Sequence, residues 1–553
     1  MKERIMILGA GVMQGPALKI AKELGFSTVA VDADPNAPCV GLADRFEKVD
    51  LKDKEGIEAL GRSLLADKAG GSLAGILTAG TDFSASVAWA AERLGLPGIP
   101  YEAALNASDK ERMRRCFRAA GIPSPEFTIL TSPPSSDASI KDIIPFALPA
   151  VVKPVDNMGG RGCRRIDTGE ELREAVTDAL RFSRSGRAIV EAFMGGPEFS
   201  VDAIVYHGEI TICGLADRHI FFPPYFIEMG HTMPTNFSAE DQKLLLDTFT
   251  AAARSLGIAG ENCCGAAKGD IKLTPNGPMI GEIAARLSGG YMSGWTYPYA
   301  SGVEPTRAAI LIAAGRRPEG LVPSRSWTCA ERAFISIPGK VRSIQGLDKA
   351  KAAPGVKDLF LRAEPGKTVS FPENNVSKCG NIIAAASGRA EAVAAAESAA
   401  RSILIRLESP TPETAAFLAE SGPFSPEHPT KFPPDAFTLS PELRAALEKL
   451  PDSNSAGKAK QGGRAQPTAG EAVQPIAILP FPAFTASGLR DYTGRTIEES
   501  LEAVRLITGL ALPVKEAAEA GEGALLLGRR FWAALVRGAY QGAAYFVDEI
   551  NGS

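Results

Sequence analysis

The clearest pattern in the chain is a pair of alternating apolar and polar runs between Gly265 and Gly290. The two runs flank Thr274-Pro275-Asn276-Gly277-Pro278, a dense cluster of turn-forming residues. Alternation of period two around such a cluster predicts a β-hairpin. With the turn centred on Asn276, the carboxylates of Asp270 and Glu282 are expected to lie opposite each other.

This register gives the hairpin a charged face and an apolar face, because successive side chains of a strand point to opposite sides. The charged face carries Lys268, Asp270, Lys272, Glu282 and Arg286. The apolar face carries Ile271, Leu273, Ile283, Ala285 and Leu287. Two facing carboxylates repel each other, so they favour a hard cation such as Mg²⁺, which usually binds together with phosphates. From the hairpin alone, the alternative to a metal site stays open: an ordinary exposed hairpin whose charges are solvated or paired with its own lysines.

A βαβ pattern opens the chain: an apolar strand at 4–8, a glycine loop at 9–15, a helix at 16–24, and a strand at 28–31 that ends at Asp32. Such a loop can hold a phosphate at the helix N-terminus. The dinucleotide fingerprint, however, needs a glycine where this chain has Gln14. A tight turn that binds no NAD is therefore favoured over an NAD-dependent oxidoreductase. Residues 75–82 repeat the strand-then-loop pattern and end in Gly-Thr-Asp.

Two lysines and a second glycine loop follow. Lys110 begins a charged helix capped by Ser108 or Asp109, and taken alone it would be a solvated helix lysine. Lys153 lies near the end of a short apolar strand, just before a loop at 155–162 with three glycines within four residues. The backbone N–H groups of such a loop can bind polyphosphate, although a flexible hairpin tip is the simpler interpretation.

Glu191 and Glu198 lie at predicted strand ends on either side of a Gly-Gly-Pro connector. They could accept hydrogen bonds from an amine or a ribose hydroxyl, although such residues are more often plain surface residues. Residues 221–234 are rich in aromatic residues and prolines and contain His231. We interpret this segment as a substrate-pocket loop, with a packed loop around a hydrogen-bonded histidine as an equal alternative.

Composition narrows the class of protein. The 553 residues suffice for three or four domains, and 45% hydrophobic and 22% charged residues are ordinary for a globular protein. The net charge of −4 without a basic block argues against nucleic acid, and no apolar run reaches the length of a membrane span. Eight cysteines without CxxC spacing indicate reduced thiols and a cytoplasmic location. Four histidines without HxxH spacing make a zinc site unexpected.

Taken together, these motifs resemble the ATP-grasp superfamily in order and spacing over roughly residues 1–405. The resemblance is carried by Lys110, the Val-Lys-Pro strand, the loop 158–162, the segment VEAFMGGPEFSVD and the charged hairpin. Within the superfamily, the Gly-Thr-Asp segment, Gly230–Pro234 and the EIAARLSGG stretch look most like amino-acid (dipeptide) ligases and the carbamoyl-phosphate-synthase-like carboxylate–amine ligases.

The resemblance implies a role for each matched residue. ATP would be bound by Lys110, Lys153, Met158, Gly159, Gly160, Arg161, Gly162, Glu191, Ala192, Phe193 and Glu198. The metal, Mg²⁺ or Mn²⁺, would be held by Asp270 and Glu282, and Lys268 and Arg286 would stabilise the transferring phosphoryl group and the acyl carboxylate. Substrate contacts would come from His231, Ser288 and Gly289. The family often has an asparagine where this chain has Ala284, which leaves the number of metal ions open.

The implied fold class is α/β with α+β subdomains. We expect a Rossmann-like pre-ATP-grasp domain at 1–100, an ATP-grasp domain at 101–320 and a small, lid-like C-terminal β domain at 321–408. A partly disordered linker would follow at 409–475, and then an α+β accessory module of unknown role at 476–553, with helices near 496–508 and 528–547.

The implied activity is ATP-dependent carboxylate–amine ligation through an acyl phosphate, on small-molecule carboxylate and amine substrates that resemble amino acids. A bicarbonate-activating enzyme like carbamoyl-phosphate synthase or biotin carboxylase, and a non-catalytic nucleotide-binding regulator, are the alternatives. We expect no nucleic acid or membrane partner, and a homodimer stays open. Because the hairpin carboxylates repel, loss of one charge is expected to leave metal-free stability unchanged or slightly raised.

Overall fold

The computed structural model describes residues 2–67, 70–135, 139–419, 432–452, 475–482, 488–521 and 523–552. The chain forms two compact units. Unit 1 contains residues 1–332, 373–375 and 383–396, and unit 2 contains residues 333–372, 376–382 and 397–553. No helix in the described ranges is long and apolar enough to cross a membrane. The eight cysteines all lie in described ranges and form no disulfide.

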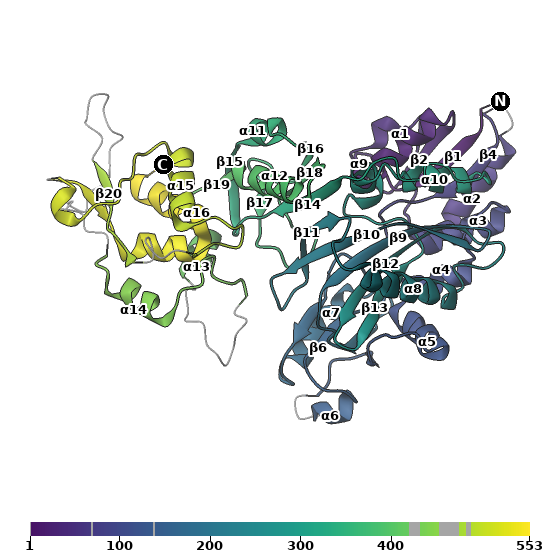
Figure 1. The fold of residues 1–553 in the computed structure, drawn as a ribbon, viewed down its shortest axis with the longest axis horizontal. Coiled ribbons are helices and arrows are strands. Elements are labelled where there is room, and N and C mark those ends of the chain that lie inside the picture. Colours follow the sequence, from purple (N-terminus) through teal and green to yellow (C-terminus); the bar gives the residue numbers. More distant parts are fainter. Residues whose placement is uncertain are drawn as a thin grey trace. The chain divides into compact units, whose positions relative to one another are not determined.

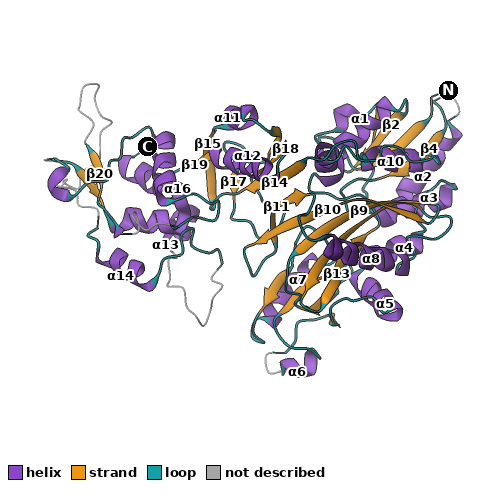
Figure 2. Cartoon of the chain, viewed as in Figure 1, coloured by secondary structure: helices purple, strands orange, loops and turns teal. Residues whose placement is uncertain are grey.

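Unit 1 begins with a parallel sheet of order β3-β2-β1-β4 (Figures 1 and 2). Its strands are β1 (Arg4–Leu8), β2 (Ser27–Asp32), β3 (Arg45–Lys48) and β4 (Leu73–Leu77), and its helices are α1 (Gly15–Glu23), α2 (Lys54–Ala66) and α3 (Ser84–Leu94). The βαβ prediction is confirmed. The glycine loop is a closed turn, because Asp32 accepts hydrogen bonds from the amides of Ala10 (2.8 Å) and Asp34 (3.0 Å). Gln14 fills the space beside Gly9, where a Cβ would lie 2.9 Å from its Cδ.

A four-stranded antiparallel sheet of order β5-β8-β6-β7 carries Lys153 and Glu191. Its strands are β5 (Phe127–Leu130), β6 (Ala150–Pro154), β7 (Arg164–Ile166) and β8 (Ala188–Ala192). Apolar residues of the sheet form a core with α7 (Leu172–Phe182) and with residues near α6 (Ile140–Ile143). Because both charged residues lie on neighbouring strands, their side chains can meet on the remaining face.

The large sheet of unit 1 runs in the order β13-β12-β9-β10-β11-β14. Its strands are β9 (Glu198–Tyr206), β10 (Glu209–Phe221), β11 (Ile227–Met233), β12 (Cys264–Thr274), β13 (Gly277–Ala284) and β14 (Thr328–Phe334). The helices α4 (Tyr101–Ser108), α5 (Lys110–Ala120) and α8 (Ala239–Ser255) bury its apolar face (Figure 1). Residues 292–296 form one π-helical turn before α9 (Tyr297–Ala300) and α10 (Pro305–Ala313).

The predicted hairpin is confirmed in its register. Asp270 pairs with Glu282 across β12 and β13, and Lys268 pairs with Ala284. The register shifts directly after Asp270, so that Ile271 pairs with Ile280. Gly281 therefore has no partner on β12, as in a β-bulge. The apolar face is buried as predicted, and Ile271 is fully inaccessible to solvent. The charged face is therefore held by a well-packed core behind it.

Unit 2 contains the remaining strands and helices. Its elements are β15 (Gly339–Gln345), β16 (Val356–Leu361), β17 (Thr368–Val369), β19 (Leu404–Leu407), β20 (Ile476–Ile478), β21 (Leu525–Leu527), α11 (Leu347–Ala352), α13 (Pro412–Ala419), α14 (Pro441–Lys449), α15 (Ile497–Thr508) and α16 (Arg529–Asn551). Three elements, β14, β18 (Gly380–Ala386) and α12 (Arg389–Ser402), are divided between the units. Both helices predicted near the C-terminus are present as α15 and α16. The alanine-rich helix α12 ends at Ser402, and the chain continues directly into β19.

The C-terminal residues are part of the same core as the small β domain. Leu404, Phe437, Leu447 and Trp532 belong to one buried cluster. The backbone of β19 is also bonded to α16, because the amide of Ile405 donates to the Tyr540 hydroxyl at 2.9 Å. One boundary between the two compact units lies near residue 332. Part of the expected linker folds as α13 and α14, whereas residues 453–474 lie outside the described residues.

Candidate active site

The charged face of the hairpin contains a dense set of ion pairs. Lys268 donates to the Asp270 carboxylate, and Arg218 Nη1 lies 3.0 Å from Asp270 Oδ1. Lys272 lies on the same strand, and its Nζ is 3.3 Å from Oε2 of Glu198 on the neighbouring β9. The expected repulsion between the carboxylates is therefore offset by cations on the same face. This arrangement overturns the physical basis for expecting unchanged or higher stability after removal of one charge.

Glu282 is held ionised by the cations around it. Lys110 Nζ lies 3.6 Å from Glu282 Oε1 and donates to the carbonyl of Asn157 at 2.8 Å. Burial alone would raise the pKa of Glu282, but Lys110, Lys153 and other cations lower this pKa to about 2. Lys110 is 4% exposed, so it is not a solvated helix lysine. It instead joins the helix start of α5, capped by Asp109, to the hairpin.

Lys153 and Glu191 form a buried ion triad with Arg114. Lys153 Nζ lies 2.8 Å from Glu191 Oε2, and Arg114 Nε donates to Glu191 Oε1 at 2.9 Å. Burial would raise the pKa of Glu191, but the two cations hold it below its ordinary value. The Glu191 carboxylate is thus engaged on both oxygens. A contact between the Glu191 carboxylate and adenine would therefore have to share an oxygen with Lys153 or Arg114.

The glycine loop lies beside these lysines. Gly159, Gly160 and Gly162 all have φ between 65° and 77°, a region that favours glycine. Arg161 Nε donates to Asn157 Oδ1 at 3.2 Å, and the Met158 amide donates to the same oxygen at 2.9 Å. The loop is further bonded to a distant segment, because the amide of residue 375 donates to the Gly159 carbonyl at 2.9 Å.

The strand end expected to receive adenine has its amides already engaged. The amide of Ala192 donates to the carbonyl of Glu126 at 2.9 Å, and that of Phe193 donates to Pro149 at 3.0 Å. The Phe193 ring stacks on Phe226 with 6.4 Å between ring centroids. These contacts leave the carbonyl groups and the aromatic ring as the groups at this position that could meet a base.

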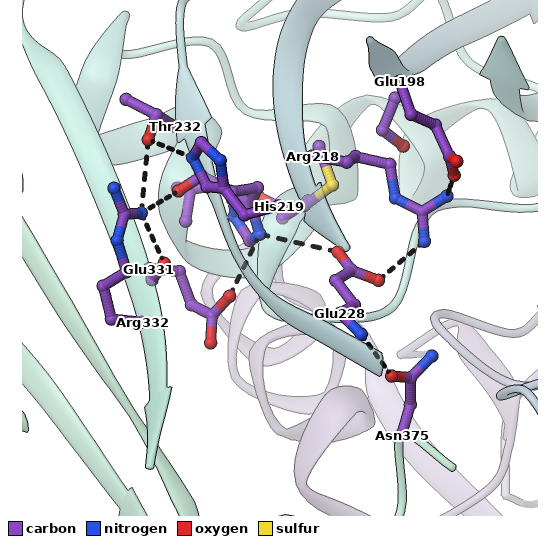
Figure 3. A network of polar contacts seen from close by, with 12 residues as sticks. Glu198, Arg218, His219, Glu228, Thr232, Glu331, Arg332 and Asn375 are labelled. Carbon is purple, nitrogen blue, oxygen red and sulfur yellow. Dashed lines mark hydrogen bonds and ion pairs between the residues drawn. The ribbon is translucent and has the colours of Figure 1, made fainter. Parts of the chain in front are cut away.

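Arg218 is the centre of a polar network on β10 and β11 (Figure 3). It pairs with Glu198, and its Nη2 lies 2.8 Å from Glu228 Oε2. The backbone amide of Glu228 donates to the side-chain oxygen of Asn375 at 2.8 Å. Arg218 thereby links Glu198, expected at the ribose, to both the hairpin and β11.

His231 lies on a strand and not in a loop. The segment 227–233 is β11, which pairs with β10 on one side and β14 on the other. The imidazole is fully buried, with Nδ1 3.3 Å from Glu331 Oε2 and 3.9 Å from Glu228 Oε1. The prediction of a pocket loop is therefore wrong for residues 227–233, because their backbone pairs with a strand on each side. The histidine reaches the network through Glu228.

Ser288 and Gly289 lie where the first sheet meets the hairpin. The amide of Ser288 donates to the buried Asp202 at 2.9 Å. A Cβ on Gly289 would lie 3.3 Å from the carbonyl oxygen of Gly80, in the Gly-Thr-Asp loop. The amide of Gly80 also donates to the Leu287 carbonyl at 3.3 Å. The loop after β4 thus contacts the residues that follow the hairpin.

Arg286 and Asp82 bring opposite charges to this junction. Arg286 is 8% exposed, and its Nη2 lies 3.5 Å from Met158 Sδ of the glycine loop. Asp82 Oδ2 lies 3.6 Å from Arg184 Nη2. Burial raises the pKa of Asp82 to about 6, against the opposing effect of Arg286 and other cations.

The raised pKa of Asp82 predicts a pH-dependent stability. In the unfolded chain Asp82 loses its proton near pH 3.8, whereas in the folded chain it keeps it to about pH 6. The stabilisation from this proton is therefore lost as pH rises between these values. Asp82→Asn does not titrate, so its Tm relative to wild type should rise over this window. Thermal melts from about pH 4 to about pH 7 measure this difference, and a constant difference contradicts the raised pKa.

The hairpin carboxylates fit Mg²⁺ bound together with phosphates. Among the described residues, no group of three or more His, Cys, Asp or Glu side chains is placed to hold a metal ion. Mg²⁺ usually takes only one or two protein carboxylates and completes its shell with water and phosphate oxygens. Asp270 and Glu282, which face each other, supply such a pair, whereas the methyl group of Ala284 supplies no ligand.

Three site residues were not anticipated from the sequence. Arg114 lies four positions after Lys110 on α5, and both are buried, so the helical spacing was an available signal. Asp202 lies on the same face of β9 as Glu198, at a spacing of four residues, which strand alternation also indicates. Arg218 had no local signal, because its position depends on how β10 pairs with β9.

Comparison with known proteins places these residues in context. Residues 146–293 match the ATP-grasp domain, and residues 333–408 match the L-amino acid ligase C-terminal domain 2. The chain is 26% identical over 397 residues to the uncharacterized protein y4rH of Sinorhizobium fredii, a match that covers 70% of this chain and 79% of that protein. It is 26% identical over 342 residues to carnosine synthase 1 of Gallus gallus. This match covers 58% of this chain and 36% of the synthase.

The fold is also that of a solved enzyme structure. The crystal structure of L-amino acid ligase from Bacillus licheniformis superposes with a TM-score of 0.62 at 21% identity. The superposition covers 74% of this chain and 99% of that one. Lys153, the glycine loop and the hairpin carboxylates lie within residues 146–293, the range that matches the ATP-grasp domain, whereas Lys110 precedes this range.

Proposed function

This chain belongs to the ATP-grasp ligases, and we propose that it joins an amino acid or a related small carboxylate to an amine through an acyl phosphate. The observation that carries the proposal is the gathering of Lys110, Lys153 and the glycine loop against the hairpin carboxylates Asp270 and Glu282. Cations, loop amides and paired carboxylates on one face are the groups that phosphoryl transfer from Mg·ATP requires.

The first step is phosphorylation of the carboxylate. A carboxylate oxygen attacks the γ-phosphorus of ATP, the bond to the β-phosphate oxygen breaks, and ADP leaves. Lys110, Lys268 and Arg286 would stabilise the charge on the transferring group, because fixed cations in a partly buried site need little rearrangement. Mg²⁺, held by Asp270 and Glu282 when bound, would neutralise the phosphate oxygens.

The second step needs no protein nucleophile. The nitrogen of the deprotonated amine attacks the acyl carbon, the carbon–oxygen bond to phosphate breaks, and phosphate leaves as the amide forms. Positioning of the two reactants accounts for most of the rate in such a step. The polar network around Arg218, Glu228 and His231 lies beside the hairpin and supports an amine-binding role for this side of the site.

Opposite charges near the hairpin end suit an amino acid. Arg286 offers a guanidinium fork that matches a carboxylate. Asp82 would hold the ammonium group once it is ionised. Both residues lie at the contact between the Gly-Thr-Asp loop and residues 287–289, so one zwitterion could contact both.

The test of this proposal is the response of phosphate release to pairs of amino acids. We expect Mg·ATP hydrolysis that depends on both a carboxylate and an amine substrate. In Arg286→Ala, the KM for the carboxylate substrate should rise about 10- to 100-fold, because a hydrogen bond to a charged group contributes about 1.5–3 kcal/mol. The KM for ATP should change much less.

Arg286→Lys is the matched control, because it keeps the positive charge but loses the planar fork. It should lie between wild type and Arg286→Ala. An alanine variant with unchanged carboxylate KM, or one that loses ATP affinity instead, would remove Arg286 from the carboxylate site.

A further inference from the structure

An apolar cavity lies next to the proposed carboxylate site. It has a volume of about 60 Å³ and lies between the end of β4, helices α3 and α10, the start of β12, and residues 285–287. Its walls are mainly aliphatic, and include Leu77, Ala88, Ile99, Ala266, Leu287 and Ala309. All of these residues belong to unit 1, so the cavity is formed within one compact unit.

Arg286 is the wall that this cavity shares with the phosphoryl-transfer site. Arg286 lines the cavity, and its Nη2 lies 3.5 Å from Met158 Sδ of the glycine loop. One guanidinium nitrogen, Nη1, donates to the Leu287 carbonyl at 2.9 Å. The buried Nε has no hydrogen-bond partner among the described residues. A carboxylate on this guanidinium would therefore carry its substituent at the entrance to the cavity.

The hydroxyl groups in the cavity wall already have partners. Thr78 Oγ1 donates to the carbonyl of Leu8 at 2.8 Å, and Ser84 Oγ lies 3.4 Å from Ser108 Oγ. Apart from Arg286, the remaining lining is thus apolar side chain and backbone. A polar group pushed into this space would lose its hydration without a matching partner, which disfavours its binding.

The volume limits the size of the occupant. A cavity of about 150 Å³ lined by apolar side chains binds benzene, which has six carbon atoms. In proportion, a cavity of 60 Å³ accommodates roughly two or three carbon atoms. This is the size of the side chains of 2-aminobutyrate and valine.

We propose that this cavity receives the side chain of the carboxylate substrate and selects a small aliphatic amino acid, with two or three side-chain carbon atoms, for phosphorylation. The inference rests on the proposed function, because it assumes that Arg286 holds the reacting carboxylate. It adds the substrate class and assigns specificity to the wall formed by Val87 and Ala88 of helix α3 together with Ile99 and Leu287.

Hydroxylamine allows the carboxylate site to be tested alone, because it captures an acyl phosphate as a hydroxamate. The purified full chain is incubated with Mg·ATP, hydroxylamine and one amino acid at a time. We expect 2-aminobutyrate and valine to exceed glycine and leucine in kcat/KM. Serine is the matched probe, because it has the same shape as 2-aminobutyrate with a hydroxyl in place of a methyl group. It should react about 10- to 100-fold less efficiently.

Two substitutions on α3 test the wall itself. Ala88→Val fills the cavity and should lower the efficiency with which 2-aminobutyrate reacts, relative to glycine, by about tenfold or more. Val87→Ala enlarges the cavity and should raise the efficiency for leucine relative to valine. Ala85→Val, on the same helix but outside the cavity lining, is the control and should keep the wild-type order of amino acids.

The outcomes separate this inference from the proposed function. If no carboxylate yields hydroxamate, the ligase proposal fails. If hydroxamate forms but serine equals 2-aminobutyrate, or both α3 variants keep the wild-type order, the cavity does not receive the side chain. If Ala88→Val misfolds, Val87→Ala alone tests the cavity. That substitution removes atoms from a partly buried position, so it is expected to fold.

Discussion

Glu282→Gln should reduce phosphate release about 10²- to 10³-fold or more while ATP still binds. The metal ligand neutralises charge that develops during phosphoryl transfer, and loss of one preorganised electrostatic contact typically costs this much in turnover. In the proposed site the glycine loop and the β8 region would also bind the nucleotide, so ATP affinity should fall much less. The measurement is phosphate release at saturating substrates together with calorimetric ATP binding. Glu209→Gln, an exposed change on β10, is the matched control.

The same variant should also be less stable than wild type without metal. Lys110 and its neighbouring cations lower the pKa of Glu282 to about 2, so the ionised carboxylate stabilises the folded chain above its unfolded pKa near 4.5. That contribution is lost as pH falls through about 2, and it is absent from the glutamine variant at neutral pH. Wild-type turnover in Glu282→Gln would contradict the metal assignment, and a higher metal-free Tm would contradict the ion-pair account.

Glu191→Gln should produce the largest loss of stability, about 3–5 kcal/mol, because it leaves two buried cations without their anion. Arg114 is fully buried, and the Lys153 side chain is 14% exposed. The measurement is denaturant unfolding. Because the chain has two compact units, it can unfold in more than one transition, and the relevant one is the transition that ATP shifts to higher denaturant concentration. Weaker ATP binding should accompany the loss, because Lys153 would no longer be oriented by Glu191.

A double variant separates charge imbalance from lost packing. Arg114→Met combined with Glu191→Gln removes one cation together with the anion and should recover part of the lost stability, because a buried pair replaced by neutral groups is often nearly neutral. If Glu191→Gln lies within about 1 kcal/mol of wild type, the triad is not a net stabilising element and its proposed role in orienting Lys153 is wrong.

The parts of the site that the sequence predicted are those set by local periodicity. Alternation and a turn cluster were sufficient for the hairpin register, because a slip of one residue would move its apolar side chains out of the core. The first βαβ unit followed from the same kind of pattern. The glycine loop and Lys153 were adjacent in sequence, so their proximity needed no tertiary information.

The parts that were missed depend on long-range pairing. Arg218 reaches Asp270 only because β10 and β12 flank β9 on opposite sides. The prolines and aromatic residues around His231 are typical of a loop, whereas pairing with β10 and β14 makes it part of a strand. Residues 409–452 resemble a linker in sequence, but Phe437 and Leu447 belong to a core whose other members include Leu404 and residues between 478 and 547.

The central claim is that the carboxylate is activated as an acyl phosphate, and oxygen transfer tests it most directly. An amino acid labelled with ¹⁸O in its carboxylate is incubated with Mg·ATP and an amine, and the released phosphate is analysed by mass. Attack of a carboxylate oxygen on the γ-phosphorus, followed by cleavage of the acyl carbon–oxygen bond, predicts one ¹⁸O atom in each phosphate released with the amide. Amide formation with unlabelled phosphate would contradict the acyl-phosphate mechanism.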